Sequence, residues 1–122
     1  MSFSSEKSSG GIAPLPSGRD LHPVAMCIGA GHVLVYANPA LITRFGRECV
    51  GLPAREALLD LPSTAFTLLD AVLQRGRPFA RWVSYDGDNW RMTVVPRIDP
   101  ITGDTYGVSF HLRPRAEERP AD

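Results

Sequence analysis

The sequence predicts a single α+β domain, in which a five-stranded antiparallel sheet has short helices and one longer helix packed on one face. Three observations lead to this prediction: two strand-like runs come first, helical patterns fill the middle, and three alternating runs follow. Because the helical patterns are grouped between two blocks of strands, the sheet is expected to be antiparallel. The helices must then cover one sheet face, since nothing else in the chain can bury it.

The composition is that of an ordinary globular protein. The chain has 122 residues, of which 43% are hydrophobic and 21% are charged, and this fits one domain with a real core. The formal net charge is zero, so no bulk charge favours nucleic acid or an anionic membrane as partner. No apolar run approaches the roughly 20 residues of a membrane-spanning helix. The start also lacks the apolar region of a signal peptide, so a cytoplasmic location is expected.

Two segments are predicted to flank the domain, which is expected to span residues 21–114. Residues 1–20 are polar and then rich in Gly and Pro, so they cannot bury much apolar area and are expected to form a flexible tail. Residues 115–122 are charged and contain Pro, and they are expected to form a second tail. Within the first tail, Ile12 and Leu15 are the side chains expected to pack on the domain or on a partner.

The domain is predicted to begin with a hairpin. Residues 23–28 and 32–37 are strand-like, and the short Gly-containing link between them is typical of an antiparallel pair. Asn38 is a strong N-cap and Pro39 suits a first helical turn, so a helix is expected over residues 40–45. Short turns are then expected as far as Pro62, with one or two helical turns among them.

The clearest helix is expected over residues 64–75. Ser63 is expected to cap it, apolar side chains recur within it at helical spacing, and Gly76 is expected to end it. Three strands with alternating apolar side chains are then predicted at 78–85, 90–95 and 106–112.

This order of elements, together with several short motifs, resembles the PAS family of sensor and interaction domains. The motifs are Val35–Ala40, Arg47–Pro53, Gly76–Pro78, Trp90–Pro96 and Gly103–Val108. The resemblance extends over about residues 21–113 and implies a pocket between sheet and helices, where some members hold haem, flavin or a small organic ligand. Other members serve as dimerisation modules. Residues 50–57 are also similar to PAS modules attached to actinobacterial phosphatase regulators, which suggests a bacterial signalling protein.

The familiar cofactors of the family lack their key residues here. Flavin photochemistry needs a Cys at the start of a helix after a Gly, but Cys49 precedes Val50–Gly51, and the photoreactive position falls nearer Ala54. Haem needs an axial ligand, usually His, and the helix over residues 64–75 contains none. Neither haem nor photoactive flavin is therefore expected.

The remaining histidines and cysteines suggest no reactive site. His22 and His32 are expected in a lead-in and a turn, and His111 on the mixed face of the last strand. Cys27 and Cys49 are too few for a disulfide framework and are expected to be buried free thiols. No metal-ligand cluster, nucleophile motif or phosphate loop is present in the sequence, so we expect no metal, no catalytic residue and no enzyme activity.

Two functions of different classes remain open. The first is a module that senses a small apolar ligand in a pocket between helices and sheet. The candidate lining residues are Leu34, Tyr36, Phe45, Leu58, Phe66, Leu69, Leu73, Trp90, Met92, Val94, Val108 and Phe110. Burial in an ordinary core would by itself explain these apolar side chains, because each contributes about 1.5–3 kcal/mol when buried.

The second function is a ligand-free module for homodimerisation or for docking to a phosphatase or kinase signalling partner. It is suggested by Trp82 and Val95, which are expected on the sheet face turned away from the helices. The candidate interface therefore combines Trp82 and Val95 with Ile12 and Leu15 of the first tail. Neither function involves nucleic acid or a membrane.

Overall fold

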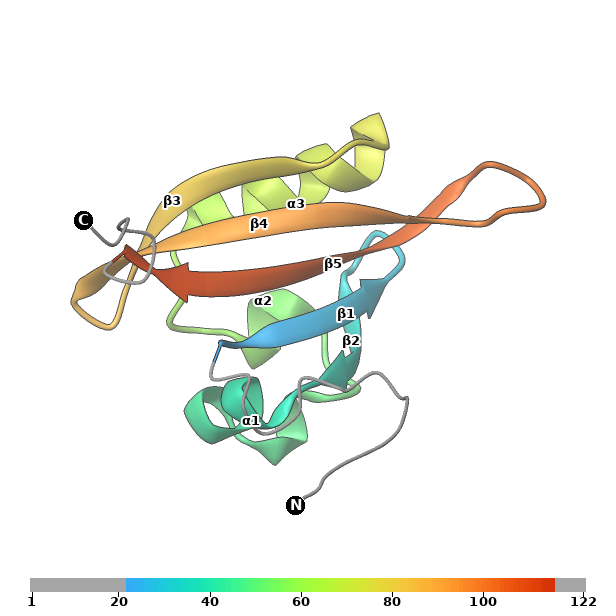
Figure 1. Cartoon of the computed structure of the whole chain (residues 1–122). Helices are drawn as coiled ribbons and strands as arrows, with labels where there is room; N and C mark the ends of the chain where they lie inside the picture. The colour runs from blue at the N-terminus through green and yellow to red at the C-terminus, as the bar shows by residue number, and fades with distance from the viewer. Residues whose placement is uncertain (1–21, 116–122) are drawn as a thin grey trace, which may run out of the picture.

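The computed structural model describes residues 22–115, and its elements follow the predicted order (Figure 1). The predictions for Ile12, Leu15 and the rest of the two tails concern residues outside this range. The elements are β1 (Val24–Ile28), β2 (Val33–Ala37), α1 (Pro39–Phe45), the 3₁₀ helix η2 (Arg47–Cys49), α2 (Ala54–Ala57), α3 (Ser63–Arg75), β3 (Phe79–Tyr85), β4 (Asp88–Ile98) and β5 (Thr105–Pro114).

The five strands form one antiparallel sheet in the order β2-β1-β5-β4-β3. Figure 1 looks onto the open face of this sheet, and α3 and α2 lie behind it. The alternation of buried and exposed positions along β4 and β5 follows from this arrangement, because one side chain in two meets the helices. The α+β architecture with helices on one face is confirmed.

Asn38 joins the first hairpin to the first helix, as its capping preference predicted. Its side-chain oxygen accepts hydrogen bonds from the amides of Leu41 and Val24, both at 3.0 Å, and its side-chain amide donates to the carbonyl of His22 at 2.9 Å. Three hydrogen bonds thereby satisfy both polar atoms of one nearly buried side chain. The cap fixes where β2 ends and which way α1 leaves the sheet.

The start of α3 differs from the prediction. Pro62, not Ser63, occupies the capping position, and no side chain caps the helix. Ser63 is already the first helical residue, so its hydroxyl is not placed to reach the free amides of the first turn. Its carbonyl instead accepts a hydrogen bond from the Thr67 hydroxyl at 3.2 Å. The helix ends at Gly76 in the left-handed conformation, as predicted.

The outer edge of β2 is covered by the segment that leads into α2. The Gly51 amide donates to the Leu34 carbonyl at 2.8 Å, and the Leu34 amide donates to the Leu52 carbonyl at 3.0 Å. The Ala54 amide donates to the carbonyl of His32 at 2.9 Å. Residues 51–54 therefore take the place of a sixth strand along this edge.

The strands β1 and β5 approach each other closely at Gly107, which pairs with Ile28. A Cβ atom added at Gly107 would lie 2.2 Å from the backbone oxygen of Cys27. Only Gly fits there, so this position determines the spacing of the two central strands. No helix within residues 22–115 is long and apolar enough to cross a membrane.

Candidate functional site

The predicted pocket residues gather where the helices meet the sheet. All of them except Tyr36 belong to one core cluster or pack against it. Most of these side chains are fully buried, as the apolar periodicity predicted. They are Leu34, Phe45, Leu58, Phe66, Leu69, Leu73, Trp90, Met92, Val94, Val108 and Phe110.

Tyr36 is the exception, and its predicted place in the pocket is wrong. Its side chain is 45% exposed, and the residue pairs with Met26 on the open side of the sheet. The register shifts between Met26 and Cys27, so Val35 is an extra residue in β2. Such a bulge reverses the alternation, and Leu34 and Tyr36 consequently face opposite sides.

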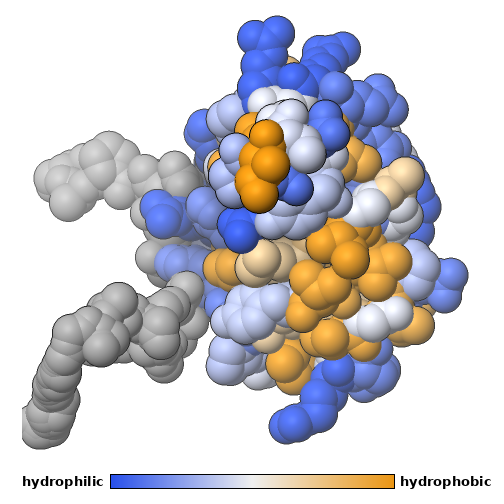
Figure 2. Space-filling model, turned by 90° about the vertical axis from the view of Figure 1, so that its right-hand side faces the viewer, coloured by the Kyte–Doolittle hydropathy of each residue, from blue (hydrophilic) through white to orange (hydrophobic). Residues whose placement is uncertain are grey.

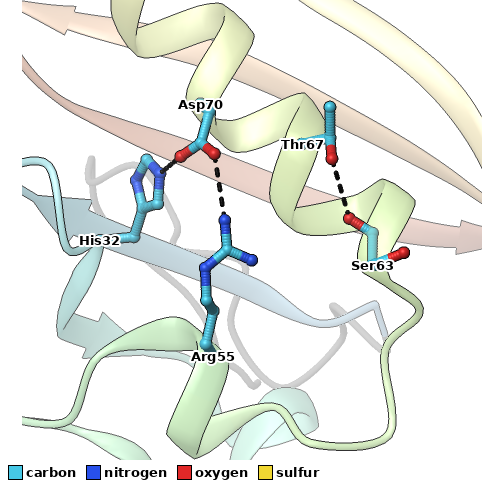
Figure 3. A network of polar contacts seen from close by, with 5 residues as sticks. All are labelled: His32, Arg55, Ser63, Thr67 and Asp70. Atoms are coloured by element: carbon cyan, nitrogen blue, oxygen red, sulfur yellow. Dashed lines mark hydrogen bonds and ion pairs between the residues drawn. The ribbon is translucent and has the colours of Figure 1, made fainter.

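A polar network lies at one end of the helix–sheet junction (Figure 3). The Nε2 atom of His32 is 2.7 Å from Oδ1 of Asp70 in α3, and Nη2 of Arg55 in α2 donates to the other carboxylate oxygen at 3.0 Å. His32 is only 2% exposed, although it lies in the turn between β1 and β2. The network therefore holds this turn and α2 against α3.

Sequence reasoning placed His32 in a turn but missed its partner. Asp70 lies one helical turn beyond Phe66, next to the buried stripe of α3, and this spacing is a signal that could have indicated an inward-facing carboxylate. The Nδ1 atom of His32 is buried without a hydrogen-bond partner among the described residues. The buried imidazole is held in place by the partly exposed Asp70 carboxylate, and this arrangement suits a structural role.

An aromatic cluster lies at the opposite end of the junction. The Phe45 and Tyr85 rings stack at 5.3 Å, and the Trp90 ring meets Tyr85 edge-on at 5.7 Å. The Trp90 indole N–H donates to the Tyr85 carbonyl at 3.0 Å. The guanidinium of Arg44 in α1 covers the cluster, with its carbon 4.7 Å from the centre of the Trp90 ring. This contact is a cation–π interaction, which is strongest over Trp.

A pocket of about 570 Å³ opens beside this cluster. It is lined by Arg44, Asp60, Tyr85 and Asp86. The Arg44 guanidinium also lies 3.7 Å from the Asp86 carboxylate. The pocket thus joins an aromatic wall to charged groups of both signs, and it lies at the mouth of the helix–sheet junction, outside the packed core.

The two cysteines are buried and free, as predicted. Burial raises the pKa of the Cys27 thiol to about 12, and the nearby Cys49 adds to this. The pKa of Cys49 is also raised, chiefly by burial. Thiolates, which are the nucleophilic and metal-binding form, are therefore disfavoured at both positions. No group of three His, Cys, Asp or Glu residues suited to a metal ion occurs within residues 22–115.

The sheet face turned away from the helices exposes both predicted interface residues. Trp82 is 45% exposed and Val95 is 40% exposed. The guanidinium carbons of Arg91 and Arg115 lie 5.7 and 5.9 Å from the centre of the Trp82 ring. The exposed indole is therefore flanked by two positive charges.

A second apolar surface lies at the end of the molecule where the β4–β5 connection projects. Figure 2 views this end, and apolar side chains gather in one area of it. Ile28 and Val35 in the first hairpin and Val50 beside it are exposed. Sequence reasoning did not single out this group, because its members come from three separate segments.

Comparisons with known proteins concern the fold. No protein-family model matches the sequence, and no curated protein matches it. A sensory box sensor histidine kinase from Vibrio cholerae is similar in structure, with a TM-score of 0.64 and 13% identity, over 76% of this chain and 81% of that one. The PAS domain of the histidine kinase ThkA has a TM-score of 0.62 at 13% identity, over 75% of this chain and 98% of that domain.

A third similar structure is the dimer of the Vibrio cholerae protein VqmA, described as a LuxR-type receptor. Its TM-score is 0.62 at 17% identity, over 83% of this chain but only 49% of VqmA. The chain therefore spans about half the length of that protein. The shared strand order, the helices on one sheet face and these likenesses agree with the motifs in the sequence, and we conclude that the chain has the fold of PAS domains.

Proposed function

We propose that this chain is a sensory signal-transduction domain that binds rather than catalyses. The fold supports this, because the similar structures include domains of sensor histidine kinases. The observation that carries the proposal is the pocket at the mouth of the helix–sheet junction, where Arg44 lies over Trp90 and Tyr85. A ligand bound there would contact α1 and the β3–β4 turn at once, and could therefore alter how the helices sit on the sheet.

The lining suggests the class of ligand. Tyr85 offers an aromatic wall, whereas Arg44, Asp60 and Asp86 offer charge at the rim. Because charged groups make up most of this lining, we propose a small polar ligand that places one apolar face against Tyr85. VqmA, which shares the fold, has been described bound to the ligand DPO. Haem and photoactive flavin are not part of this proposal, because the ligating His and the reactive Cys are missing from the expected positions.

Native mass spectrometry of the purified full chain tests the proposal. We expect a bound small molecule in the unaltered chain and its loss from the Arg44→Glu variant. The Arg75→Glu variant is the matched control, because Arg75 also lies over an aromatic ring, that of Phe79, but outside the pocket. Bare protein in the unaltered chain, together with no ligand-induced rise in melting temperature in a metabolite screen, contradicts the proposal.

A second candidate function is ligand-free docking through the open sheet face. The exposed Trp82 and Val95 on one sheet face favour it, since apolar side chains that gather on a surface often mark an interaction site. VqmA, one of the similar structures, is described as a dimer. Light scattering on the full chain and on the Trp82→Ala variant tests this candidate. If the chain associates with itself through this face, the unaltered chain is a dimer and the variant is a monomer.

A further inference from the structure

We propose that the open face of the sheet docks an acidic segment of a partner protein. This inference rests on the second candidate function above and names the chemistry of the partner. It follows from how charge is distributed over the sheet.

Charge is segregated in a chain whose formal net charge is zero. Within residues 22–115, no Asp or Glu occupies a position of the five strands that faces away from the helices. Arginines occupy several such positions. They are Arg91 and Arg97 in β4, Arg113 in β5 and Arg115 directly after β5. The open face is therefore basic, and the compensating carboxylates of the described residues lie on helices, in turns and, for Asp88, on the helix side of β4.

Three of the four arginines lie near Trp82, whereas Arg97 lies toward the other end of β4. Trp82 pairs with Arg91 across β3 and β4, and Arg91 pairs with Arg113 across β4 and β5, so the three form one row across the sheet. Arg115 approaches the same indole. A guanidinium that lies over an aromatic ring keeps its N–H donors available for a carboxylate. Arg91 and Arg115 thus offer charge-assisted hydrogen bonds beside an aromatic anchor, as interface hot spots commonly do.

An acidic protein segment fits this face better than nucleic acid does. The next row on this face runs from Ala80 through Thr93 and His111 to Val24, and the row after it runs from Val95 through Ser109 to Met26. Val95 is exposed. The apolar members of these rows, Ala80 and Val95, can contact aliphatic groups of a peptide, whereas they form no hydrogen bond with a phosphodiester backbone. Within residues 22–115 no ion pair joins Arg91 or Arg115 to a carboxylate, so these two guanidiniums are available to a partner.

A second copy of this chain fits poorly. A symmetric dimer brings the same patch of both copies together, so each arginine row would face another arginine row. Like charges that meet across an interface oppose association. The face therefore selects a partner of opposite charge.

Fluorescence anisotropy with the full chain tests this inference. The probe is a labelled peptide of alternating glutamate and leucine, and its controls are a glutamine–leucine peptide and an oligothymidylate. We expect the acidic peptide alone to bind. The Arg91→Gln/Arg115→Gln double variant and the Trp82→Ala variant should each weaken it about tenfold or more. The Arg75→Gln variant, which removes an arginine from the helix side of the molecule, should leave it unchanged.

Four results would overturn the inference: no binding of the acidic peptide, equal binding of the neutral peptide, tighter binding of the oligothymidylate, or an equal loss in Arg75→Gln. Binding that appears only in the Glu117→Gln/Glu118→Gln variant would also overturn it, in favour of the chain's own acidic end as occupant. A homodimer that dissociates on Trp82→Ala would preserve the docking function and overturn the acidic partner. If the acidic peptide does not bind and light scattering shows no dimer, both the acidic partner and the docking function are contradicted.

Discussion

The Nε2 atom of His32 lies 2.7 Å from Oδ1 of Asp70, and this contact joins the β1–β2 turn to the middle of α3. The two residues are 38 positions apart in the sequence. One of them is fully enclosed, while the other also receives Arg55 from α2. Three elements that otherwise share few polar contacts therefore depend on a single carboxylate.

Replacing Asp70 with Leu is expected to destabilise the domain by about 1–3 kcal/mol, because the buried His32 loses its hydrogen-bond partner. Asp70→Asn should cost less, since an amide oxygen can still accept from Nε2. Urea unfolding followed by circular dichroism measures both changes. Glu56→Leu is the control, because Glu56 is exposed on α2. Equal losses in the Leu and Asn variants would contradict a role for the hydrogen bond.

Gly107→Ala is expected to destabilise the domain by about 3 kcal/mol or more, because overpacking a site that cannot relax is costly. The added Cβ would meet backbone atoms of β1, not the end of a flexible side chain. Gly31→Ala is the matched control, since a Cβ there meets nothing within 4 Å. It should change stability by less than about 1 kcal/mol. Thermal melts of the two variants measure this difference in stability. A similar melting temperature for both would show that β1 and β5 can move apart.

Arg44→Leu is expected to destabilise the domain by about 1 kcal/mol through loss of the cation–π contact with Trp90. The chain has two tryptophans, so a Trp82→Phe background leaves Trp90 as the fluorescent reporter. In that background, Arg44→Leu should also make Trp90 more accessible to acrylamide quenching. Arg47→Leu is the control on the neighbouring helix. Unchanged quenching in Arg44→Leu would mean that the guanidinium does not shield the ring.

Stability is expected to fall as the pH rises above about 9. The folded chain holds the Cys27 pKa at about 12, whereas an unfolded thiol has the ordinary value of 9.0. Between these values the unfolded state binds fewer protons than the folded state, so this contribution is complete below pH 9 and is lost toward pH 12. The slope from one such group is at most about 1.4 kcal/mol per pH unit.

Urea unfolding at a series of alkaline pH values measures this slope. The Cys27→Ala variant is less stable overall because it loses buried volume, but its stability should depend less steeply on pH. A thiol reagent provides a second readout at neutral pH, where both cysteines should react only after unfolding. Identical slopes with and without Cys27 would contradict the raised pKa.

Local signals predicted much of this fold. The Asn38–Pro39 pair predicted the start of α1 within one residue, because a cap acts on amides only a few positions away. Period-two alternation likewise predicted which side chains of β4 and β5 are buried. Even so, burial of an apolar side chain and contact with a ligand leave the same pattern. The candidate pocket residues other than Tyr36 therefore form the packed core, and the pocket at Arg44 was not predicted.

The features that could not be predicted from the sequence depend on pairing between distant segments. The bulge at Val35 arises from the register of β2 against β1, and nothing in the residues Val33–Ala37 themselves predicts it. Tyr36 was consequently assigned to the wrong face. The same holds for Asp70, whose partner comes from a turn far earlier in the chain. Such contacts are decided by tertiary packing, which a single sequence does not encode in its local spacing.

The segment of residues 51–54 that covers β2 has a consequence for how copies of this chain can associate. With that edge closed, β3 is the one sheet edge that remains unpaired within residues 22–115. Growth of a fibril by strand addition needs two open edges on every subunit, because each subunit must pair with one neighbour on either side. A sheet with one open edge can join one further sheet and then stops. Edge-to-edge association of this domain is therefore self-limiting at a pair.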